Sequence, residues 1–178
     1  MGDWNGWYHV TFHTYGTWLP GDERGWRSRH HKRHVEGDYK HPPPPGQDEG
    51  LRQYSKDQLN DAPVHLAGLE RQIVGQALVE MLVEQGVELL DLSVDAVHCH
   101  LLARLGGAPS RAIVGRAKQH AYYRLRATTG RQRLWGKRGR TNPISSRAHQ
   151  LRTYRYILDH ATNGAWVWTF RQGLTWQT

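Results

Sequence analysis

The spacing of hydrophobic residues changes along the chain between the two-residue period of strands and the three-to-four-residue period of helices. Residues 7–15 (WYHVTFHTY) alternate in polarity and are rich in aromatic and β-branched types, which predicts a first strand. Apolar residues then recur in steps of three and four before Gly86, which predicts an amphipathic helix. The predicted buried face of this helix is Leu66, Leu69, Ile73, Ala77 and Met81.

The second half of the chain continues the same alternation. Two apolar runs, 87–94 and 97–105, are separated by two residues and predict a β-hairpin. A second helix is expected from Ser110 to a closing Gly130, and a short strand or hairpin is expected around Trp135. The predicted buried side of the second helix is Ile113, Ala117, Ala121 and Leu125.

A third helix is predicted near the end of the chain. Ser145 or Ser146 is the expected N-cap, and the helix should run to about Thr162. Its predicted buried stripe is Leu151, Tyr154, Leu158 and Ala161. The resulting order of strand, helix, strand, strand, helix, strand and helix predicts an α+β fold, a ferredoxin-like antiparallel sheet with helices packed on it and an extra C-terminal helix.

Chain length and local composition suggest how this fold is organised. The 178 residues suit a single domain, 1–178. Residues 19–63 are rich in Gly and Pro, then polar, basic and rich in His, and could not build a core. We therefore expect a long insertion there, extended or partly disordered. Residues 164–178 are expected to form a C-terminal tail.

Charge favours a polyanionic partner. Lys and Arg total 24 against 16 Asp and Glu, which gives a formal net charge of +8. The chain also holds 8 Trp and 8 Tyr, and cations beside aromatic rings can hold a phosphate backbone while bases stack. The single Cys99 cannot form an internal disulfide, and neither a basic leader nor a membrane-length apolar run is present. We therefore expect a cytoplasmic protein without a membrane partner.

The predicted hairpin carries two histidines on one face. His98 and His100 lie two residues apart in a strand, so both imidazoles leave the same side while Cys99 points to the other. Two nitrogens so placed can converge on one divalent ion, although half-exposed sheet histidines show the same pattern. His9 and His13 share one face of the first strand, either as groups that support such a site or as ordinary sheet histidines.

The third helix adds a phenol and a third imidazole. Tyr156 and His160 lie four residues apart on one helix face, away from the predicted buried stripe. One helix could therefore bring a nucleophile and a ligand to an ion held by the strand. A phenol needs a nearby cation to attack at neutral pH, and phosphoryl transfer depends mainly on positioning and charge neutralisation. With phosphate oxygens and water completing the shell, Mg²⁺ or Mn²⁺ is expected, and Zn²⁺ is the alternative.

These residues resemble a known family. VHCHLL on a strand, followed far downstream by YRYILDH on a helix, is similar to the HUH single-tyrosine transposases, also called insertion sequence 200-like. The early GTW in residues 16–18 is similar to their REP-associated branch. The resemblance implies an HUH endonuclease that recognises a hairpin in single-stranded DNA and cuts it through a 5′-phosphotyrosine link. It matches His98 and His100 to the histidine pair, Tyr156 to the nucleophile and His160 to the residue that completes the metal shell.

Several basic and aromatic residues are candidates for DNA contact. The candidates on the second helix, the following basic segment and the third helix are Arg111, Arg116, Lys118, Arg124, Trp135, Arg138, Arg140 and Arg152. A solvated helix face and a buried Trp135 are the competing interpretations. A non-catalytic hairpin-binding regulator and a three-histidine zinc hydrolase are the competing functions, and both monomer and homodimer are open.

Overall fold

The computed structural model describes residues 4–26, 44–106 and 110–174, without the side chain of Arg138. Parts of the expected insertion (27–43) and of the expected tail (175–178) therefore lie outside the described residues. The chain forms two compact units, residues 1–14 with 65–178 and residues 15–64. No described helix is long and apolar enough to cross a membrane.

The larger unit is an antiparallel sheet with three helices. Its elements in chain order are β1 (Trp7–Thr14), α2 (Gly68–Glu84), β2 (Glu88–Val94), β3 (His98–Arg104), α3 (Ser110–Thr129), β4 (Trp135–Pro143), α4 (Arg147–Asp159) and β5 (Trp166–Thr169). The sheet order is β4-β1-β3-β2-β5, with every neighbouring pair antiparallel. The first four strands have the ferredoxin-like arrangement, so the predicted α+β fold is confirmed.

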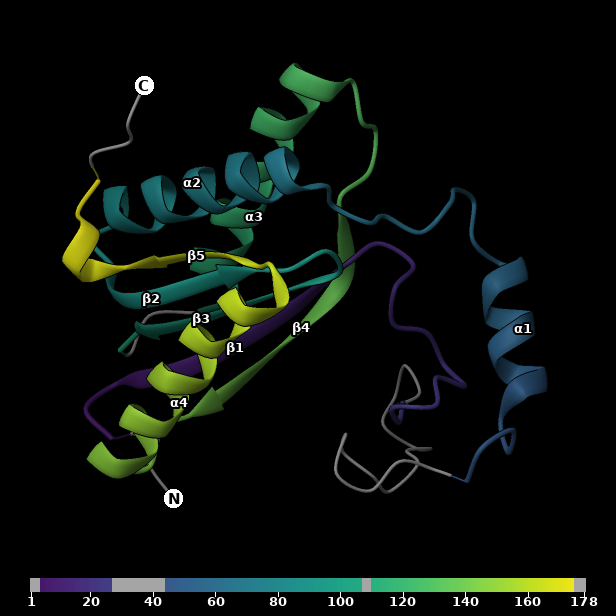
Figure 1. Ribbon diagram of the computed structural model, residues 1–178, viewed down its shortest axis with the longest axis horizontal. Coiled ribbons are helices and arrows are strands. Elements are labelled where there is room, and N and C mark those ends of the chain that lie inside the picture. The colour runs from purple at the N-terminus through teal and green to yellow at the C-terminus, as the bar shows by residue number, and fades with distance from the viewer. Residues whose placement is uncertain (1–3, 27–43, 107–109, 175–178) are drawn as a thin grey trace. The chain divides into compact units, whose positions relative to one another are not determined.

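The two faces of the sheet carry different helices. Phe12 of β1 pairs with Cys99 of β3, and this face lies under α2 and α3, which pack on each other. Thr11 pairs with His100 on the opposite face, because successive strand residues point to opposite sides. Helix α4 packs on that second face against β2 and β3 (Figure 1). The histidine strand is therefore covered by the helix that carries Tyr156.

The buried face of α2 differs from the prediction. Leu69 is 67% exposed, whereas the buried residues are Val74, Gly75, Ala77, Leu78, Val79 and Leu82. Of the predicted residues, Ala77 is buried within the helix, and Leu66 is buried just before the helix begins. The reason is that α2 contacts α3, β2 and β5 together, so its burial extends over a wider arc than a single apolar stripe. In α3 the prediction is closer, with Val114 buried in place of Ile113 beside Ala117, Ala121 and Leu125.

Helix α4 begins as predicted but buries other residues. Ser146 is the N-cap, and its Oγ accepts a hydrogen bond from the His149 backbone N–H at 3.1 Å. The predicted stripe is wrong at two of its four positions, since Leu151 is 40% exposed and Ala161 is exposed, while Tyr154 and Leu158 are half-buried. The buried positions are Gln150, Thr153 and Ile157. Ile157 packs with Trp7, Leu102 and Ile144, and Tyr154 lies against this cluster. Two inward residues are polar, which explains why hydrophobic spacing pointed to another face.

The expected tail contains a strand. After a short 3-10 helix (His160–Asn163), β5 pairs with β2 from Val94↔Trp166 to Asp91↔Thr169. A second 3-10 helix (Phe170–Gln172) follows. The pairing brings the Trp166 ring against Gly75 of α2, where a Cβ would overlap the ring. A glycine is therefore required at this contact between α2 and the edge strand.

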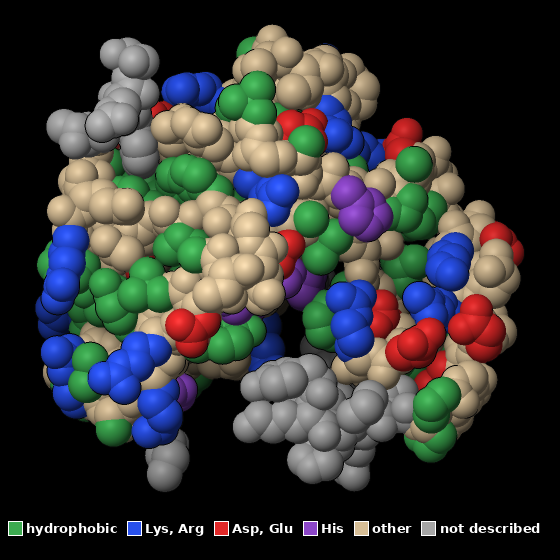
Figure 2. Space-filling model, viewed as in Figure 1, with side chains coloured by type: hydrophobic (Ala, Val, Ile, Leu, Met, Phe, Trp, Pro, Cys, Tyr) green, Lys and Arg blue, Asp and Glu red, His purple; other side chains and the backbone are tan. Residues whose placement is uncertain are grey.

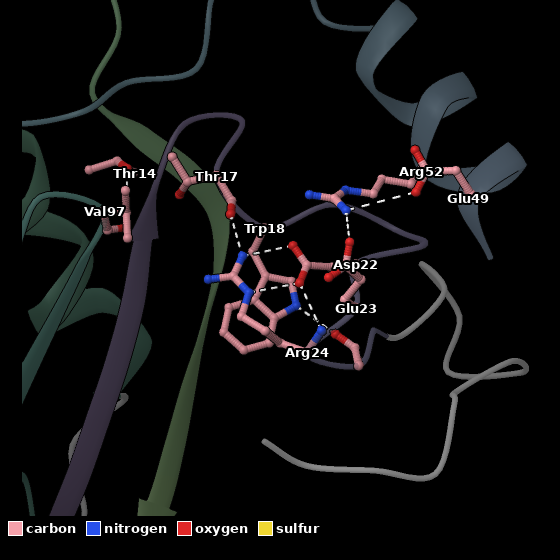
Figure 3. Close-up of polar contacts among 10 residues, drawn as sticks. Thr14, Thr17, Trp18, Asp22, Glu23, Arg24, Glu49, Arg52 and Val97 are labelled. Carbon is pink, nitrogen blue, oxygen red and sulfur yellow. Dashed lines mark hydrogen bonds and ion pairs between the residues drawn. The ribbon is translucent and has the colours of Figure 1, made fainter. Parts of the chain in front are cut away.

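The smaller unit has its own polar framework (Figure 3). Arg24 donates from Nε and Nη2 to the two carboxylate oxygens of Asp22, both at 2.7 Å, and lies 4.5 Å above the Trp18 ring. Arg52 forms an ion pair with Glu23. Arg52 belongs to helix α1 (Glu49–Asp57), a segment that the sequence predicted to be extended. The prediction of an extended or partly disordered segment is therefore wrong over these residues, where the Gln53 side chain donates to Asp57 at 2.8 Å within the helix.

Two glycines give a matched test of the packing. Gly75→Ala should lower the free energy of unfolding by about 1–3 kcal/mol, because its methyl group would overlap Trp166. Gly115 is an exposed residue inside α3 with open space around it. Gly115→Ala should therefore raise the free energy of unfolding by about 0.5–1 kcal/mol. Urea unfolding of both variants measures the difference. Equal effects would contradict the described contact between α2 and β5.

Asp91 of β2 predicts a pH-dependent stability. Its side chain is fully buried, neither carboxyl oxygen has a hydrogen-bond partner among the described residues, and burial raises its pKa to about 8. The unfolded carboxyl ionises near 3.8, so unfolding releases a proton in the range between these values, and stability falls as pH rises. Asp91→Asn should remove this loss of several kcal/mol, measured by urea unfolding between about pH 4 and about pH 8.

The matched control for this measurement is Glu88→Gln, which changes an exposed carboxylate on the same strand. It should leave the pH dependence of the unfolding free energy as in the wild type. The same pH slope in wild type and Asp91→Asn would show that Asp91 is not the titrating group.

Candidate functional site

Three histidines from two segments form one group. His98 and His100 leave β3 on the face covered by α4, and His160 begins the 3-10 helix that follows α4. One ligand nitrogen of each lies within 4.8 Å of the others. The ring centroids of His98 and His100, and of His100 and His160, are 4.7 Å apart. The spacing and the donor type allow the group to hold one metal ion.

A hydrogen bond orients one of these rings, and a carboxylate lies near a second. His160 Nδ1 lies 2.8 Å from the backbone carbonyl oxygen of Tyr156, which can only accept, so this nitrogen carries the proton. The His160 lone pair is therefore at Nε2. His98 Nδ1 lies 3.8 Å from an Asp95 carboxylate oxygen, and this charge favours a proton on that nitrogen. Acceptors on the far nitrogen are the usual support of metal-binding histidines.

His100 is the buried centre of the group. It is 5% exposed, and its Nε2 is buried without a hydrogen-bond partner among the described residues. Burial, followed by the neighbouring histidines His98 and His9, lowers the pKa of His100 well below its usual range. The ring is therefore neutral at neutral pH. A buried nitrogen with an unused lone pair fits a metal ligand, and a bound cation would remove the cost of leaving it unpaired.

Tyr156 lies beside this group. It precedes His160, the C-cap residue of α4, by four residues, so the two side chains lie on one side of the helix end. Its ring centroid is 4.7 Å from that of His160 and 5.3 Å from that of His100. The side chain is 43% exposed although it sits above a buried histidine. The structure thus brings together the four residues His98, His100, Tyr156 and His160 that sequence reasoning selected.

Two further residues contact His100 from β1. His9 Nε2 and Thr11 Oγ1 each lie 3.1 Å from His100 Nδ1. Burial lowers the pKa of His9 to about 4, so this ring is also neutral at neutral pH. The ring of His13 lies 6.1 Å from that of His98. Sequence reasoning named both histidines as possible supporting groups but missed Thr11, which only the β1–β3 register places opposite His100.

Most of the basic candidates on α3 lie on the other face of the sheet. Arg116 donates to Gln85 at 2.6 Å and Arg124 to Glu80 at 3.1 Å, while Arg111 is exposed. Lys118 is half-buried, and its Nζ donates to the Gly136 carbonyl at 3.2 Å. Trp135 donates to the Lys118 carbonyl at 2.7 Å and packs edge-on against Phe12. The contacts of Arg116 and Arg124 thus join α3 to α2 and its C-cap, and those of Lys118 and Trp135 join α3 to β4, all away from the histidines.

Two candidates lie on the histidine face. Arg140 of β4 pairs with Thr11 and is therefore in the same cross-strand row as His100. Its side chain is exposed and donates to Asn142 at 2.9 Å. Arg152 is exposed on α4, one turn before Tyr156, and Lys and Arg side chains gather over this helix in Figure 2. The side chain of Arg138 lies outside the described part of the chain.

Comparison with known proteins gives a distant structural likeness. No protein-family model matches the chain, and no curated protein matches it. Among solved structures, a REP-associated tyrosine transposase bound to a REP hairpin matches over 92% of this chain and 75% of its own, with a TM-score of 0.47 and 13% identity. A likeness at this level is weak, so the function proposed below rests on the residues of this chain.

Removing the central histidine tests the metal group. His100→Ala should weaken Mn²⁺ binding by more than about 100-fold, because a direct ligand contributes more than the groups that merely support ligands. The free-ion EPR signal of Mn²⁺ reports the binding. His120→Ala, on α3 beside Glu80, is the matched control and should bind as the wild type does. Unchanged binding in His100→Ala, with a wild-type circular dichroism spectrum, would contradict the site.

Proposed function

We propose that this protein is a metal-dependent single-stranded DNA endonuclease and strand transferase in which Tyr156 is the nucleophile. The observation that carries the proposal is the position of the Tyr156 ring beside a group of three histidines that could hold a metal ion, His98, His100 and His160. An exposed phenol next to a cation site has the two components that tyrosine attack on a phosphodiester needs. The resemblance of VHCHLL and YRYILDH to the HUH single-tyrosine transposases supports the same chemistry.

The proposed reaction exchanges one phosphoester for another. The Tyr156 oxygen forms a bond to phosphorus and gives its proton to solvent, while the bond to the 3′ oxygen breaks and that oxygen takes up a proton. The products are a 5′-phosphotyrosine and a free 3′-hydroxyl, and attack by a 3′-hydroxyl reverses the step. A divalent cation held by the histidines would polarise the scissile phosphate and neutralise its charge. We propose Mg²⁺ or Mn²⁺, and nitrogen ligands favour Mn²⁺ of these two.

The proposed substrate is DNA with a hairpin, as the family resemblance implies. Arg140 and Arg152 are the basic residues best placed to hold its phosphates, since both lie on the histidine face of the sheet. Arg111, Arg116, Lys118, Arg124 and Trp135 lie on the other face, and they would serve only a strand that passes around the sheet. Arg138, two residues before Arg140 in the sequence of β4, is proposed with the first pair.

A covalent adduct tests the nucleophile. Labelled single-stranded hairpin oligonucleotides incubated with the protein and Mn²⁺ should give a protein–DNA band on a denaturing gel. Tyr156→Phe should abolish the band, because the ring remains but the attacking oxygen is gone. Tyr154→Phe is the matched control, because Tyr154 lies on the same helix against the core cluster, and it should form the adduct normally.

The other outcomes separate the alternatives. An adduct that persists in Tyr156→Phe would show that another residue attacks. Cleavage without any adduct would favour a three-histidine zinc hydrolase that activates water. Hairpin binding without cleavage, equal in both tyrosine variants, would favour a non-catalytic regulator.

A further inference from the structure

The two nitrogens of His100 have different surroundings. Nε2 is buried and lacks a partner among the described residues, whereas Nδ1 has two neighbours at 3.1 Å, His9 Nε2 and Thr11 Oγ1. Thr11 Oγ1 also lies 3.5 Å from His9 Nε2. Both neighbours come from β1, whereas His100 belongs to β3, so the pairing of these strands creates the contact.

We propose that Thr11 and His9 are positioning residues that hold His100 with its proton on Nδ1 and its lone pair on Nε2. The inference rests on the proposed metal-dependent function, because it assigns these two residues the task of preparing one ligand. Neither residue is proposed to touch the ion or the DNA.

The direction of the hydrogen bonds follows from the donor and acceptor inventory. If His100 Nδ1 carries the proton, it donates to Thr11 Oγ1 or to His9 Nε2, and the Thr11 hydroxyl can donate onward to His9 Nε2. His100 Nδ1, Thr11 Oγ1 and His9 Nε2 then each have a donor or acceptor role. If His100 instead carried its proton on Nε2, a buried N–H would have no acceptor, and the ring could not bind a cation there.

The neighbouring histidine already shows the same arrangement. His160 donates from Nδ1 to the Tyr156 carbonyl, which leaves its Nε2 as the ligand nitrogen. A proton on His100 Nδ1 would give both rings the same orientation of donor and lone pair. The difference is that a carbonyl can only accept, whereas Thr11 Oγ1 and His9 Nε2 can each donate or accept, and either of them can accept the Nδ1 proton of His100.

The metal-free wild-type protein tests the inference directly. Long-range ¹H–¹⁵N NMR distinguishes protonated from unprotonated ring nitrogens, and His100 should give a protonated Nδ1 and an unprotonated Nε2 at neutral pH. A protonated Nε2 in the wild type would overturn the proposal, and this readout needs neither an ion nor a DNA substrate.

Variants give the second readout. Thr11→Val combined with His9→Phe keeps the side-chain shapes but removes both partners of Nδ1. This double variant should weaken Mn²⁺ binding by about 10- to 100-fold, the usual effect of losing the groups behind a metal ligand. The single variant Thr11→Ser, which keeps His9, should bind Mn²⁺ as the wild type does, because the hydroxyl remains. Thr141→Val changes an exposed threonine on β4 and is the matched control.

The results separate this inference from the proposed function. Wild-type Mn²⁺ affinity in the folded double variant would overturn the positioning role, even if Tyr156 still formed its adduct. The opposite case is a wild-type protein that has a protonated His100 Nδ1 but never cuts DNA, and a double variant that binds Mn²⁺ more weakly. These results would support the positioning role while the endonuclease proposal fails.

Discussion

The packing of helix α4 on the histidine face of the sheet is the contact on which the site depends. Ile157 is fully buried against Leu102, which lies two residues after His100 on the same strand face. Since Tyr156 precedes Ile157 and His160 follows one turn later, this one contact fixes where the phenol and the third imidazole arrive. The candidate ligands His98 and His100 are held by the sheet itself, so the helix brings the remaining parts to them.

The same face carries buried polar groups that cost stability. Asp91 and His100 both lie under α4. Burial raises the pKa of Asp91 and lowers the pKa of His100, so both side chains favour their neutral forms. Ser93 pairs with His100 across the strands, and its hydroxyl also lacks a partner among the described residues. An apolar face would pack α4 more favourably. The proposed metal binding would account for the buried imidazole of His100.

Sequence reasoning identified the elements better than their buried faces. The β2–β3 hairpin and the start of α4 at Ser146 follow from local signals, namely period-two alternation and a capping serine. The inward face of α4 could not be read from hydrophobicity, because Gln150 and Thr153 point inward while Leu151 points out. In the site, the ligand spacing was visible in the sequence, but Thr11 was not, since its place opposite His100 depends on pairing between distant strands.

Crystals of the protein grown with Mn²⁺ would test the central claim most directly through anomalous scattering. The account predicts one anomalous peak from an ion that is coordinated by His98, His100 and His160, with the Tyr156 hydroxyl facing the coordination positions that the histidines leave open. A peak at other residues, or an ion whose open side is closed to Tyr156, would contradict it.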